Sequence, residues 1–401
     1  MRVTSRSVNL NIQKNISSRY GDLARLQEQL STGKRLLRPS DDPIDVSNDM
    51  KMRSKKVQLK QFKRNIEDGL AYMGVSSTAL TSMNELLHRM RELAVQASND
   101  TQTESERAFV QQEVDQLFRQ VISATNTKFK GDYVFNGTQT KVPPFVLEES
   151  RDNPENYQKS SMAYYDAGGA ALGDTVQLNI GTGSTPVRNI MPGSFKLEVQ
   201  GTEYLEGQDY TVDYQSGEIT LLNTDLLEDV TPASANYAQG EFSIEFDYLT
   251  RGKDVYGNEV SSKGEVLREI ENGISMAINT SADDVLTDQK TGVDMVGTLM
   301  RYSEALHKNE HGGIQNAIDE ISTMFGSILN SQSQIGSKVN RFELTLSRNE
   351  EQHVEVSALQ SALEDADMAD VISRYTLSEN VYNAALQTAA RVIQPSLVNF
   401  L

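Results

Sequence analysis

Two histidines form the first group of side chains whose types and spacing could do chemistry. His307 and His311 stand in HKNEH, which has the H-x-x-E-H spacing of one class of zinc peptidase. On a continuous helix this spacing places both imidazoles on one face. Gly312 and Gly313 follow at once, so we expect the pair at a helix end, and no third ligand is evident. The prediction is a structural role.

A second group is acidic. The stretch EDADMAD contains Asp365, Asp367 and Asp370 but lacks the glycine and the terminal glutamate of a calcium loop. Ser361 and Glu364 have the spacing of a helix capping box, and acids in a first helical turn interact favourably with the helix dipole. We therefore predict a helix start here and no calcium site.

A third group, Asp41 and Asp42, stands between two prolines and could be a catalytic dyad, a metal site or a bend between helices. The prolines prevent a continuous helix, and aspartates favour turns and N-caps. Arg35 and Arg38 just upstream can neutralise the acids, and no histidine is near in sequence. We predict a rigid, charge-balanced corner. Its helix-bend residues are Arg38, Pro39, Asp41, Asp42 and Pro43.

Composition narrows the function further. The chain has 401 residues and no cysteine, which removes disulfides, thiolate metal ligands and a cysteine nucleophile. Only 38% of the residues are hydrophobic and tryptophan is absent, which is typical of long amphipathic helices and lean for a compact enzyme. We predict no catalytic, cofactor-binding or metal-binding residues, no cofactor and no enzymatic activity.

Charge is distributed unevenly along the chain, whose net charge is −18. Residues 1–38 contain eight Lys or Arg and two Asp or Glu, whereas residues 132–287 contain nine basic and 26 acidic residues. An acidic middle argues against nucleic acid, because phosphate binding needs clustered Lys and Arg. No apolar run of signal-peptide or membrane-spanning type is present, so we expect no membrane insertion.

Apolar periodicity predicts helices at both ends of the chain. In the first, apolar residues step by fours and threes from Ile12 to Leu37, which is a heptad seam. A similar stripe runs from Phe62 to Ala97, and another from Ile321 to Leu346. A last amphipathic segment, from about residue 365 to 393, has a stripe formed by Met368, Ile372, Tyr375, Val381 and Leu386.

The middle of the chain has the period of strands. The alternating stretches GDYVFNGTQ, SFKLEV, EFSIEFDYL and the pair of strands in DYTVDYQSGEITLL predict a β-rich region. In VLREIENGISMAIN, Asn272 and Gly273 divide two alternating runs, which predicts a hairpin with a tight primed turn.

These patterns predict an α + β fold that is mostly α. A long antiparallel helical, coiled-coil rod is made from both chain ends, with a β-rich insertion domain in the middle, because an apolar stripe without a local partner must bury itself elsewhere. We expect five segments. They are an N-terminal assembly helix (1–38), rod-core helices with the bend (39–130), a β-rich outer domain (131–290), rod-core helices (291–362) and a C-terminal assembly helix (363–401).

Three stretches closely resemble flagellin-like axial proteins. They are LSTGKRLLRPSDDPIDVSNDMKMRS, RNIEDGLAYMGVSSTALTSMNELLHRMRELAVQASND and the C-terminal SALEDADMADVISRYTLSENVYNAALQTAARVIQPSLVNFL. NTKFKGDYVFNGTQTKVPPF (126–145) and the ending LQTAARVIQPSLVNFL resemble the hook-associated protein 3 family more than filament flagellin. The resemblance covers roughly residues 1–140 and 290–401, and the region from about 146 to 287 lies outside it.

The resemblance implies a structural protein of the bacterial flagellum that joins hook to filament. It implies export through the flagellar type III channel and an extracellular location. The implied partners are further copies in a ring, an adjacent hook-associated protein, flagellin, and an export chaperone on the C-terminal helix. The expected assembly interface places Ile12, Ile16, Leu23, Leu26 and Leu30 opposite Ile372, Val381 and Leu386, with Tyr375 on the same C-terminal stripe.

Two alternatives stay open. The chain could be flagellin itself, the filament subunit, which would polymerise from seeds without stopping after a limited layer. It could also be an axial protein whose β insertion is a binding module, such as an adhesin, or a surface hydrolase. The acids of that insertion mostly alternate with apolar residues, as a solvated strand face does.

Overall fold

The computed structural model describes residues 5–99, 104–149, 175–177, 179–180, 185–186, 188–199, 202–222, 242–253, 262–288 and 290–393. The chain divides into two compact units, the first with residues 1–65 and 344–401 and the second with residues 66–343. Both boundaries fall inside long helices. Each unit therefore holds one part of α2 (Pro43–Ala97) and one part of α9 (His311–Glu364).

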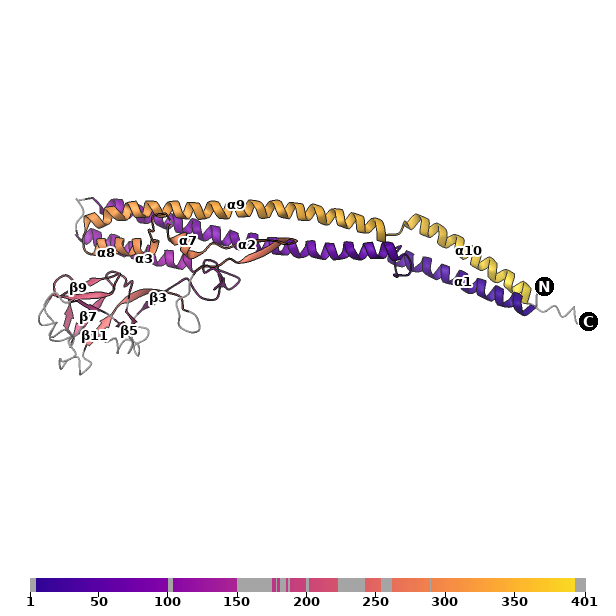
Figure 1. Cartoon of the computed structure of the whole chain (residues 1–401), viewed down its shortest axis with the longest axis horizontal. Helices are drawn as coiled ribbons and strands as arrows, with labels where there is room; N and C mark the ends of the chain where they lie inside the picture. The colour runs from indigo at the N-terminus through magenta and orange to yellow at the C-terminus, as the bar shows by residue number, and fades with distance from the viewer. Residues whose placement is uncertain are drawn as a thin grey trace, which may run out of the picture. The chain divides into compact units, whose positions relative to one another are not determined.

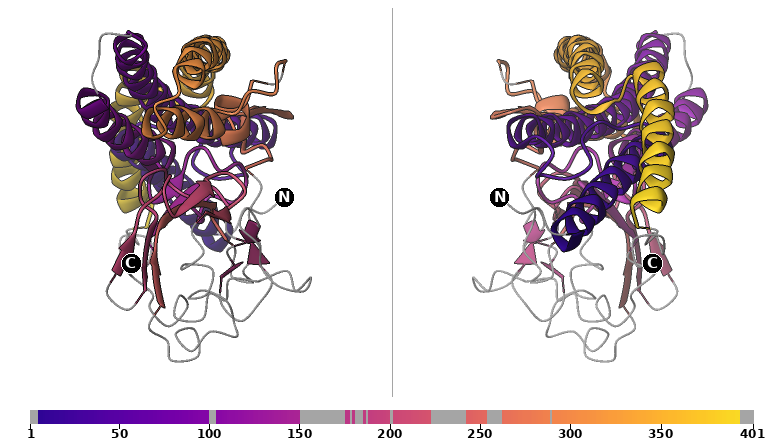
Figure 2. Two further views of the ribbon diagram at one scale, coloured as in Figure 1. Left: turned by 90° about the vertical axis from the view of Figure 1, so that its left-hand side faces the viewer. Right: turned by 90° about the vertical axis from the view of Figure 1, so that its right-hand side faces the viewer.

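In the first unit, the two terminal helices run antiparallel and side by side (Figure 1). They are α1 (Ser5–Thr32) and α10 (Met368–Ile393), and the right-hand view of Figure 2 shows them packed together. Helix α1 ends where Gly33 adopts a φ of 69°, and its N–H donates to the carbonyl of Gln29 at 2.8 Å. A glycine supplies this left-handed conformation without the steric cost of a Cβ.

The start of α10 differs from the sequence prediction. Ser361 and Glu364 lie inside α9, which continues to Glu364, so the predicted capping box is wrong. Asp367 caps α10 instead, because its carboxylate accepts from the N–H groups of Ala369 at 2.9 Å and Asp370 at 3.3 Å. Asp367 satisfies two N–H groups that lack a partner within the helix.

Helices α2 and α9 run antiparallel to each other within each unit. In the first, Lys63 Nζ lies 2.7 Å from Glu350 Oε1, and in the second the rings of His88 and Phe325 lie 4.2 Å apart. In the second unit α2 and α9 bury most of the stripes that the sequence predicts. The stripe residues with no exposed surface are Ile66, Met73, Leu80, Met83, Leu87, Met90, Ala94, Ala97, Ile321, Met324, Ile328 and Phe342.

Gly69 lets α2 and α9 approach each other closely in the second unit. A Cβ built there would lie 2.5 Å from Cε1 of Phe342 and 3.2 Å from Cγ2 of Ile278. Glycine thus makes room for an aromatic ring against the backbone of α2.

Among the described residues of the second unit there are three further helices: α3 (Glu104–Thr125), α7 (Ala282–Leu286) and α8 (Met295–His307). Helix α8 packs on α3, where Ser303 Oγ donates to Asp115 Oδ1 at 2.6 Å. Ser281 and Asp294 cap α7 and α8 by accepting from the N–H groups of Asp284 and Gly297.

The described strands pair only in antiparallel fashion. Two sheets have three strands, in the orders β4-β10-β9 and β11-β7-β8, and four are two-stranded pairs, β1-β2, β12-β3, β13-β14 and β5-β6. The first seven strands are β1 (Lys128–Phe129), β2 (Asp132–Tyr133), β3 (Phe145–Glu149), β4 (Thr175–Gln177), β5 (Asn179–Ile180), β6 (Thr185–Pro186) and β7 (Lys196–Val199). The others are β8 (Thr202–Tyr204), β9 (Tyr210–Asp213), β10 (Glu218–Leu221), β11 (Phe242–Glu245), β12 (Asp247–Arg251), β13 (Leu267–Glu271) and β14 (Ile274–Ala277).

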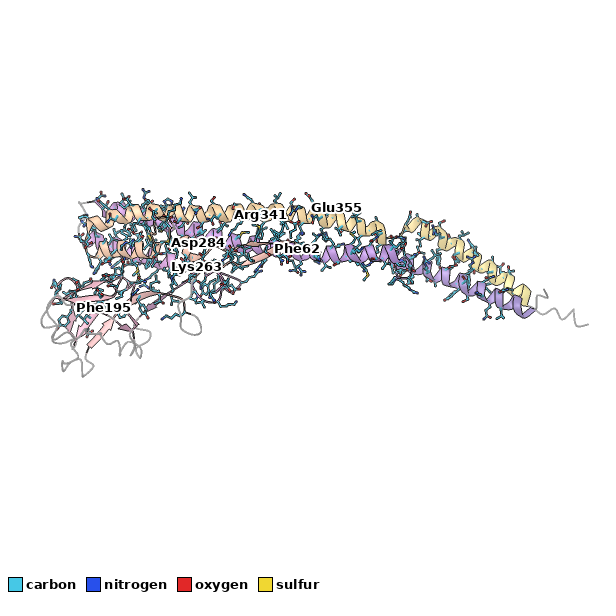
Figure 3. The ribbon with its side chains drawn as sticks, in the orientation of Figure 1. Phe62, Phe195, Lys263, Asp284, Arg341 and Glu355 are labelled. Atoms are coloured by element: carbon cyan, nitrogen blue, oxygen red, sulfur yellow. The ribbon has the colours of Figure 1, made fainter. Side chains whose placement is uncertain are left out.

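Aromatic side chains hold part of this β region together. Phe195, labelled in Figure 3, lies just before β7 and packs its ring 5.4 Å from that of Tyr210 on β9 and 6.2 Å from that of Phe246. Phe246 is buried between β11 and β12, which belong to different sheets. The stretch EFSIEFDYL, predicted as one strand, is therefore two strands, because burial of Phe246 at its centre interrupts the ladder.

Other strand predictions fare better. SFKLEV forms β7, and DYTVDYQSGEITLL forms the paired β9 and β10. VLREIENGISMAIN forms the hairpin of β13 and β14, but the predicted primed turn is wrong, since of the two turn residues only Gly273 has a positive φ. The ladder compensates with a register shift between Glu269 and Glu271.

The predicted fold class, mostly α with a β-rich middle, is confirmed by this order of elements. The five predicted segments describe assembly roles and stay a proposal. The two compact units divide the chain at other positions, after residues 65 and 343.

Candidate assembly site

The corner that joins α1 to α2 is built from backbone hydrogen bonds of its two aspartates. Asp42 caps α2, since its Oδ1 accepts from the N–H groups of Ile44 and Asp45, each at 3.1 Å. Pro43 is the first residue of the helix, where its missing N–H costs nothing and its fixed φ suits a helix start. Asp42 and Pro43 together set where α2 begins.

The carboxylate of Asp41 binds backbone N–H groups that precede it in the chain, whereas that of Asp42 binds groups that follow it. The Oδ2 of Asp41 accepts from the N–H groups of Arg38 at 2.8 Å and Leu37 at 3.1 Å, and the N–H of Asp41 donates to the carbonyl of Arg38 at 2.9 Å. The hydrogen bond from the Arg38 N–H is the main reason why the pKa of Asp41 lies below its ordinary value. Both carboxylates thus hold backbone, which is the geometry of a rigid corner.

The arginines near this corner have other partners than predicted. Arg35 pairs with Asp45 at 2.5 Å, and Arg38 pairs with Glu28 at 3.3 Å. Neither makes an ion pair with Asp41 or Asp42 among the described residues, and Arg38 acts on Asp41 chiefly through its backbone N–H. Backbone donors hold these carboxylates in place of a direct ion pair, and the charge of Arg38 adds a smaller lowering of the pKa of Asp41.

A second chain break, between α9 and α10, lies directly beside the first. The N–H of Arg35 donates to the carbonyl of Glu364 at 2.7 Å, and the N–H of Ala366 donates to the carbonyl of Gly33 at 2.9 Å. Lys34 and Asp365 therefore pair like residues of two antiparallel strands. Because backbone bonds join the two breaks, neither can change direction without affecting the other.

A buried carboxylate holds this double break in place. Glu364 is only 4% exposed, and its Oε1 accepts from Lys34 Nζ and from Arg53 Nη2, the latter at 2.5 Å. Gln360 Nε2 donates to Oε2 at 3.0 Å, and Arg53 also pairs with the buried Asp49 at 2.8 Å. A buried charge is tolerated when it is paired and hydrogen-bonded in this way.

The sequence pattern predicted Glu364 as part of a helix cap, whereas in the structure it binds the two cations at the double break. The one local signal was the i, i+4 pair of Asp49 and Arg53 on a helix. Lys34 and Glu364 are 330 positions apart, so only the folded chain brings them together.

The predicted residues of the N-terminal interface lie on the face of α1 that packs on α10. Ile12, Ile16, Leu23, Leu26 and Leu30 are all half-buried. From α10 the seam is formed by a stripe in steps of four and seven: Val371, Tyr375, Tyr382 and Ala389. Val371 is 6% and Ala389 5% exposed, and the Tyr382 ring lies 6.1 Å from that of Tyr20.

Three of the predicted C-terminal residues do not face α1 in this chain. Ile372 is 52% exposed, and Val381 and Leu386 are each 41% exposed. Only Tyr375 of the predicted stripe lies in the seam. The apolar residues of α10 span more than one face, and periodicity alone did not show which face α1 covers. The exposed three remain candidates for contact with other copies.

The two histidines of HKNEH are separated by the break between α8 and α9, where Asn309 has a φ of 57°. His307 Nε2 lies 2.9 Å from Glu206 Oε2, and His311 Nε2 lies 3.2 Å from Arg107 Nη1. They therefore do not share one helical face. Across the described ranges, no three His, Asp or Glu side chains gather as a metal site would require.

Glu206 receives two hydrogen bonds in this part of the second unit, from His307 and from the hydroxyl of Tyr214. Burial acts to raise the pKa of Glu206, but these bonds outweigh it, and the pKa lies below its ordinary value. Burial and the Glu206 charge raise the pKa of Tyr214. The arrangement clamps the loop after β8 onto the end of α8.

The segment from Asn126 to Phe145 is a closed structural unit. Asn126 Nδ2 donates to the carbonyl of Phe145 at 2.7 Å, and the Phe145 N–H donates back to Asn126 Oδ1 at 3.3 Å. Inside the segment, Val134 and Phe135 are fully buried, and the Tyr72 hydroxyl on α2 donates to the Val134 carbonyl at 2.7 Å. Asn126 thus links both ends of this segment, which packs on α2.

Two family descriptions match the chain at its ends. The bacterial flagellin N-terminal helical region matches residues 3–140, and the bacterial flagellin C-terminal helical region matches residues 316–401. The matched residues include α1, α2, α3, nearly all of α9, and α10. The chain belongs to the flagellin family.

Relatives within this family match over almost the whole chain. The chain is 24% identical over 391 residues to a flagellin from Clostridium tyrobutyricum, covering 96% of this chain and 95% of the relative. It is 25% identical over 415 residues to flagellin E from Vibrio cholerae, covering 98% of each. Among solved structures, FlgL from Bacillus cereus is 16% identical, with a TM-score of 0.43 and coverage of 78% of this chain and 99% of that one.

The chain is accordingly an axial structural protein of the flagellum, outside the cell body. In the part of the chain that the structure describes, no helix combines the length and apolarity needed to cross a membrane.

Proposed function

We propose that this flagellin-family protein joins the hook to the filament and assembles as a ring through its terminal helices. The supporting observation is the segment 126–145, whose sequence resembles the hook-associated protein 3 family. The same residues form one closed unit, tied by Asn126 and seated on α2. The finer assignment within the family rests on the resemblance of this segment.

The terminal helices support assembly in a physical way. Each helix buries only one side of its apolar surface in the α1–α10 seam, and Ile372, Val381 and Leu386 are left exposed. Exposed apolar side chains at helical spacing gain free energy when another copy covers them. The Glu364 cluster then acts as the joint that holds the terminal pair at a set angle to α2 and α9 within the first unit.

The proposed partners are other copies of the chain, an adjacent hook-associated protein, flagellin and an export chaperone. The chaperone would cover the apolar face of α10 before export through the flagellar type III channel, since an amphipathic helix suits a complementary groove. No nucleic acid and no enzymatic step belong to this proposal. The matched family regions are helical regions of a structural protein.

Localisation in the cell tests this proposal. Antibody labelling should give a single band at the boundary between hook and filament. Deletion of the gene should leave complete hooks without attached filaments, and flagellin should appear in the medium. Label spread along the whole filament would overturn the junction assignment.

A second candidate is the filament subunit, favoured by the near full-length match to flagellins. Growth on seeds separates the two. A filament subunit elongates fragments of filament continuously as it is added, whereas a junction protein adds a limited layer to isolated hooks and then stops.

A further inference from the structure

A groove in the first unit has the character of a docking site. It lies between α2 and α9 and has a volume of about 1060 Å³. Its walls combine lysines with two valines, Val57 and Val354, which are 67% and 68% exposed. Branched apolar side chains held open to water on both walls favour an apolar occupant.

The groove is basic because of the local sequence. The stretch KMRSKKVQLKQFKR, residues 51–64, contains seven Lys or Arg and no acid. In the groove Arg53 pairs with Asp49 and Glu364, and Lys63 pairs with Glu350. Within the described residues, Lys56 and Lys60 have no ion-pair partner. The two lysines and the exposed valines would therefore be complemented by a partner surface that carries both acidic and apolar side chains.

The start of α10 is a surface of that kind. Asp365, Asp367 and Asp370 are exposed, and Asp370 pairs with Arg374 at 2.9 Å. No basic residue occurs between residues 361 and 373, so this surface remains acidic. Among these acids, Met368 is 41% and Ile372 52% exposed, one helical turn apart. The acids and the apolar pair thus match the lysines and valines of the groove in both charge and character.

We propose that the groove of one copy receives the start of α10 from a second copy. The chain's own α10 is held against α1 and leaves the groove open. Two different surfaces meet in such a contact, so it is heterologous and repeats from copy to copy instead of closing in a two-fold dimer. The inference rests on the proposed assembly through terminal helices and names the surface that α10 meets.

Cross-linking between copies tests the contact directly, because the natural chain has no cysteine. One population carries Val57→Cys and the other Met368→Cys, and both are joined with a flexible bismaleimide. The reaction is run on flagella from cells that express both variants and on concentrated protein in solution. We expect a product of two chains that forms only when both variants are present.

Leu377→Cys is the matched control. Leu377 is 65% exposed on the same helix, nine residues after Met368, which places it on the opposite side of α10. It should give little product with Val57→Cys. Equal yields from Leu377→Cys and Met368→Cys, or no product from Met368→Cys in either preparation, would overturn the inference.

Charge reversal supplies an independent readout. Lys56→Glu with Lys60→Glu should lower the cross-link yield about tenfold at low salt, because like charges then face each other. Lys51→Glu with Arg64→Glu makes the same change of charge on the same helix outside the groove lining and should leave the yield unchanged. Asp365→Lys with Asp370→Lys in the partner copy should restore it. Equal losses in both lysine and control variants would count against a specific contact.

The outcomes separate this inference from the proposed function. Label along the filament with the cross-link retained would remove the junction role and keep the contact. A normal junction without the cross-link would remove the contact and keep the role.

Discussion

The two units of this chain use the same helices in different ways. In the second unit, α2 and α9 bury most of their apolar stripes, and residues such as Leu80 and Phe342 have no exposed surface. In the first unit, the α1–α10 seam is half-buried, and Ile372 and Val381 remain open to water. Burial of apolar area is the main source of folding free energy. We therefore expect the helical core of the second unit to account for more of the folding free energy than the α1–α10 seam of the first unit.

Charge reinforces this contrast. The first unit holds its double break with a buried carboxylate, Glu364, bonded to two half-exposed cations, Lys34 and Arg53. Ion pairs need defined geometry but add little net stability, because desolvation offsets attraction. Such a cluster fixes the direction of the chain at the two breaks more than it adds to the free energy of unfolding, as a joint requires.

The largest effect that tests this contrast is expected in the second unit. Phe342→Ala should lower the free energy of unfolding by about 3–5 kcal/mol, because it empties a fully buried site against Gly69. Leu26→Ala, in the half-buried seam, should cost about 1 kcal/mol or less in the monomer and slow assembly instead. Urea unfolding followed by circular dichroism measures both, and equal losses would contradict the division.

The joint should show a smaller and more local effect. Glu364→Ala leaves two cations without their buried partner, and because both are about half-exposed we expect a loss of about 1–2 kcal/mol. Hydrogen exchange should speed up at the amides of Arg35 and Ala366, which bond across the two breaks. Glu364→Gln keeps the shape of the side chain and one acceptor oxygen but loses the charge, and is the matched control. Unchanged exchange in Glu364→Ala would show that the backbone bonds suffice.

The second unit should respond to pH through Asp115. Burial raises the pKa of this carboxyl to about 6 from 3.8. Because the folded chain then holds the proton more tightly than the unfolded one, this group makes stability fall as pH rises from about 4 to 6. Asp115→Asn removes that loss and should be more stable than the natural chain by about 1–2 kcal/mol at pH 8, with no gain near pH 4. Urea unfolding at both pH values decides it, and an equal gain at both would assign the effect to packing.

The smallest change is expected at the corner. Asp41→Asn with Asp42→Asn should cost at most about 1 kcal/mol per cap, since asparagine also accepts from backbone N–H groups. The monomer should stay folded and soluble while motility falls through weaker assembly. Melting by circular dichroism and a swarm assay measure the two parts. Loss of a hydrolytic or metal-dependent activity in this variant would contradict the structural role of the corner.

Much of the helical architecture could be predicted from the sequence because it depends on local periodicity. Stripes such as Ile66 to Ala97 are buried as their spacing predicts. The corner at Asp41 and Asp42 could also be predicted from the sequence, because proline geometry and N-capping act over a few residues. The hairpin at Asn272 and Gly273 followed from the same local logic, although its turn type did not.

Only the tertiary structure decided which distant parts of the chain contact each other. Lys34 reaches Glu364 across 330 positions, and no local pattern indicates that this glutamate is buried and holds two cations. The stripe of α10 has two apolar flanks, so periodicity allowed Ile372 or Val371 to face α1, and packing chose Val371. EFSIEFDYL alternates from Glu241 to Tyr248, yet Phe246 packs against Phe195 and divides the stretch between two sheets. Periodicity determines which residues of a helix or strand share a face, whereas the partner of that face is set by the free energy of the whole packed unit.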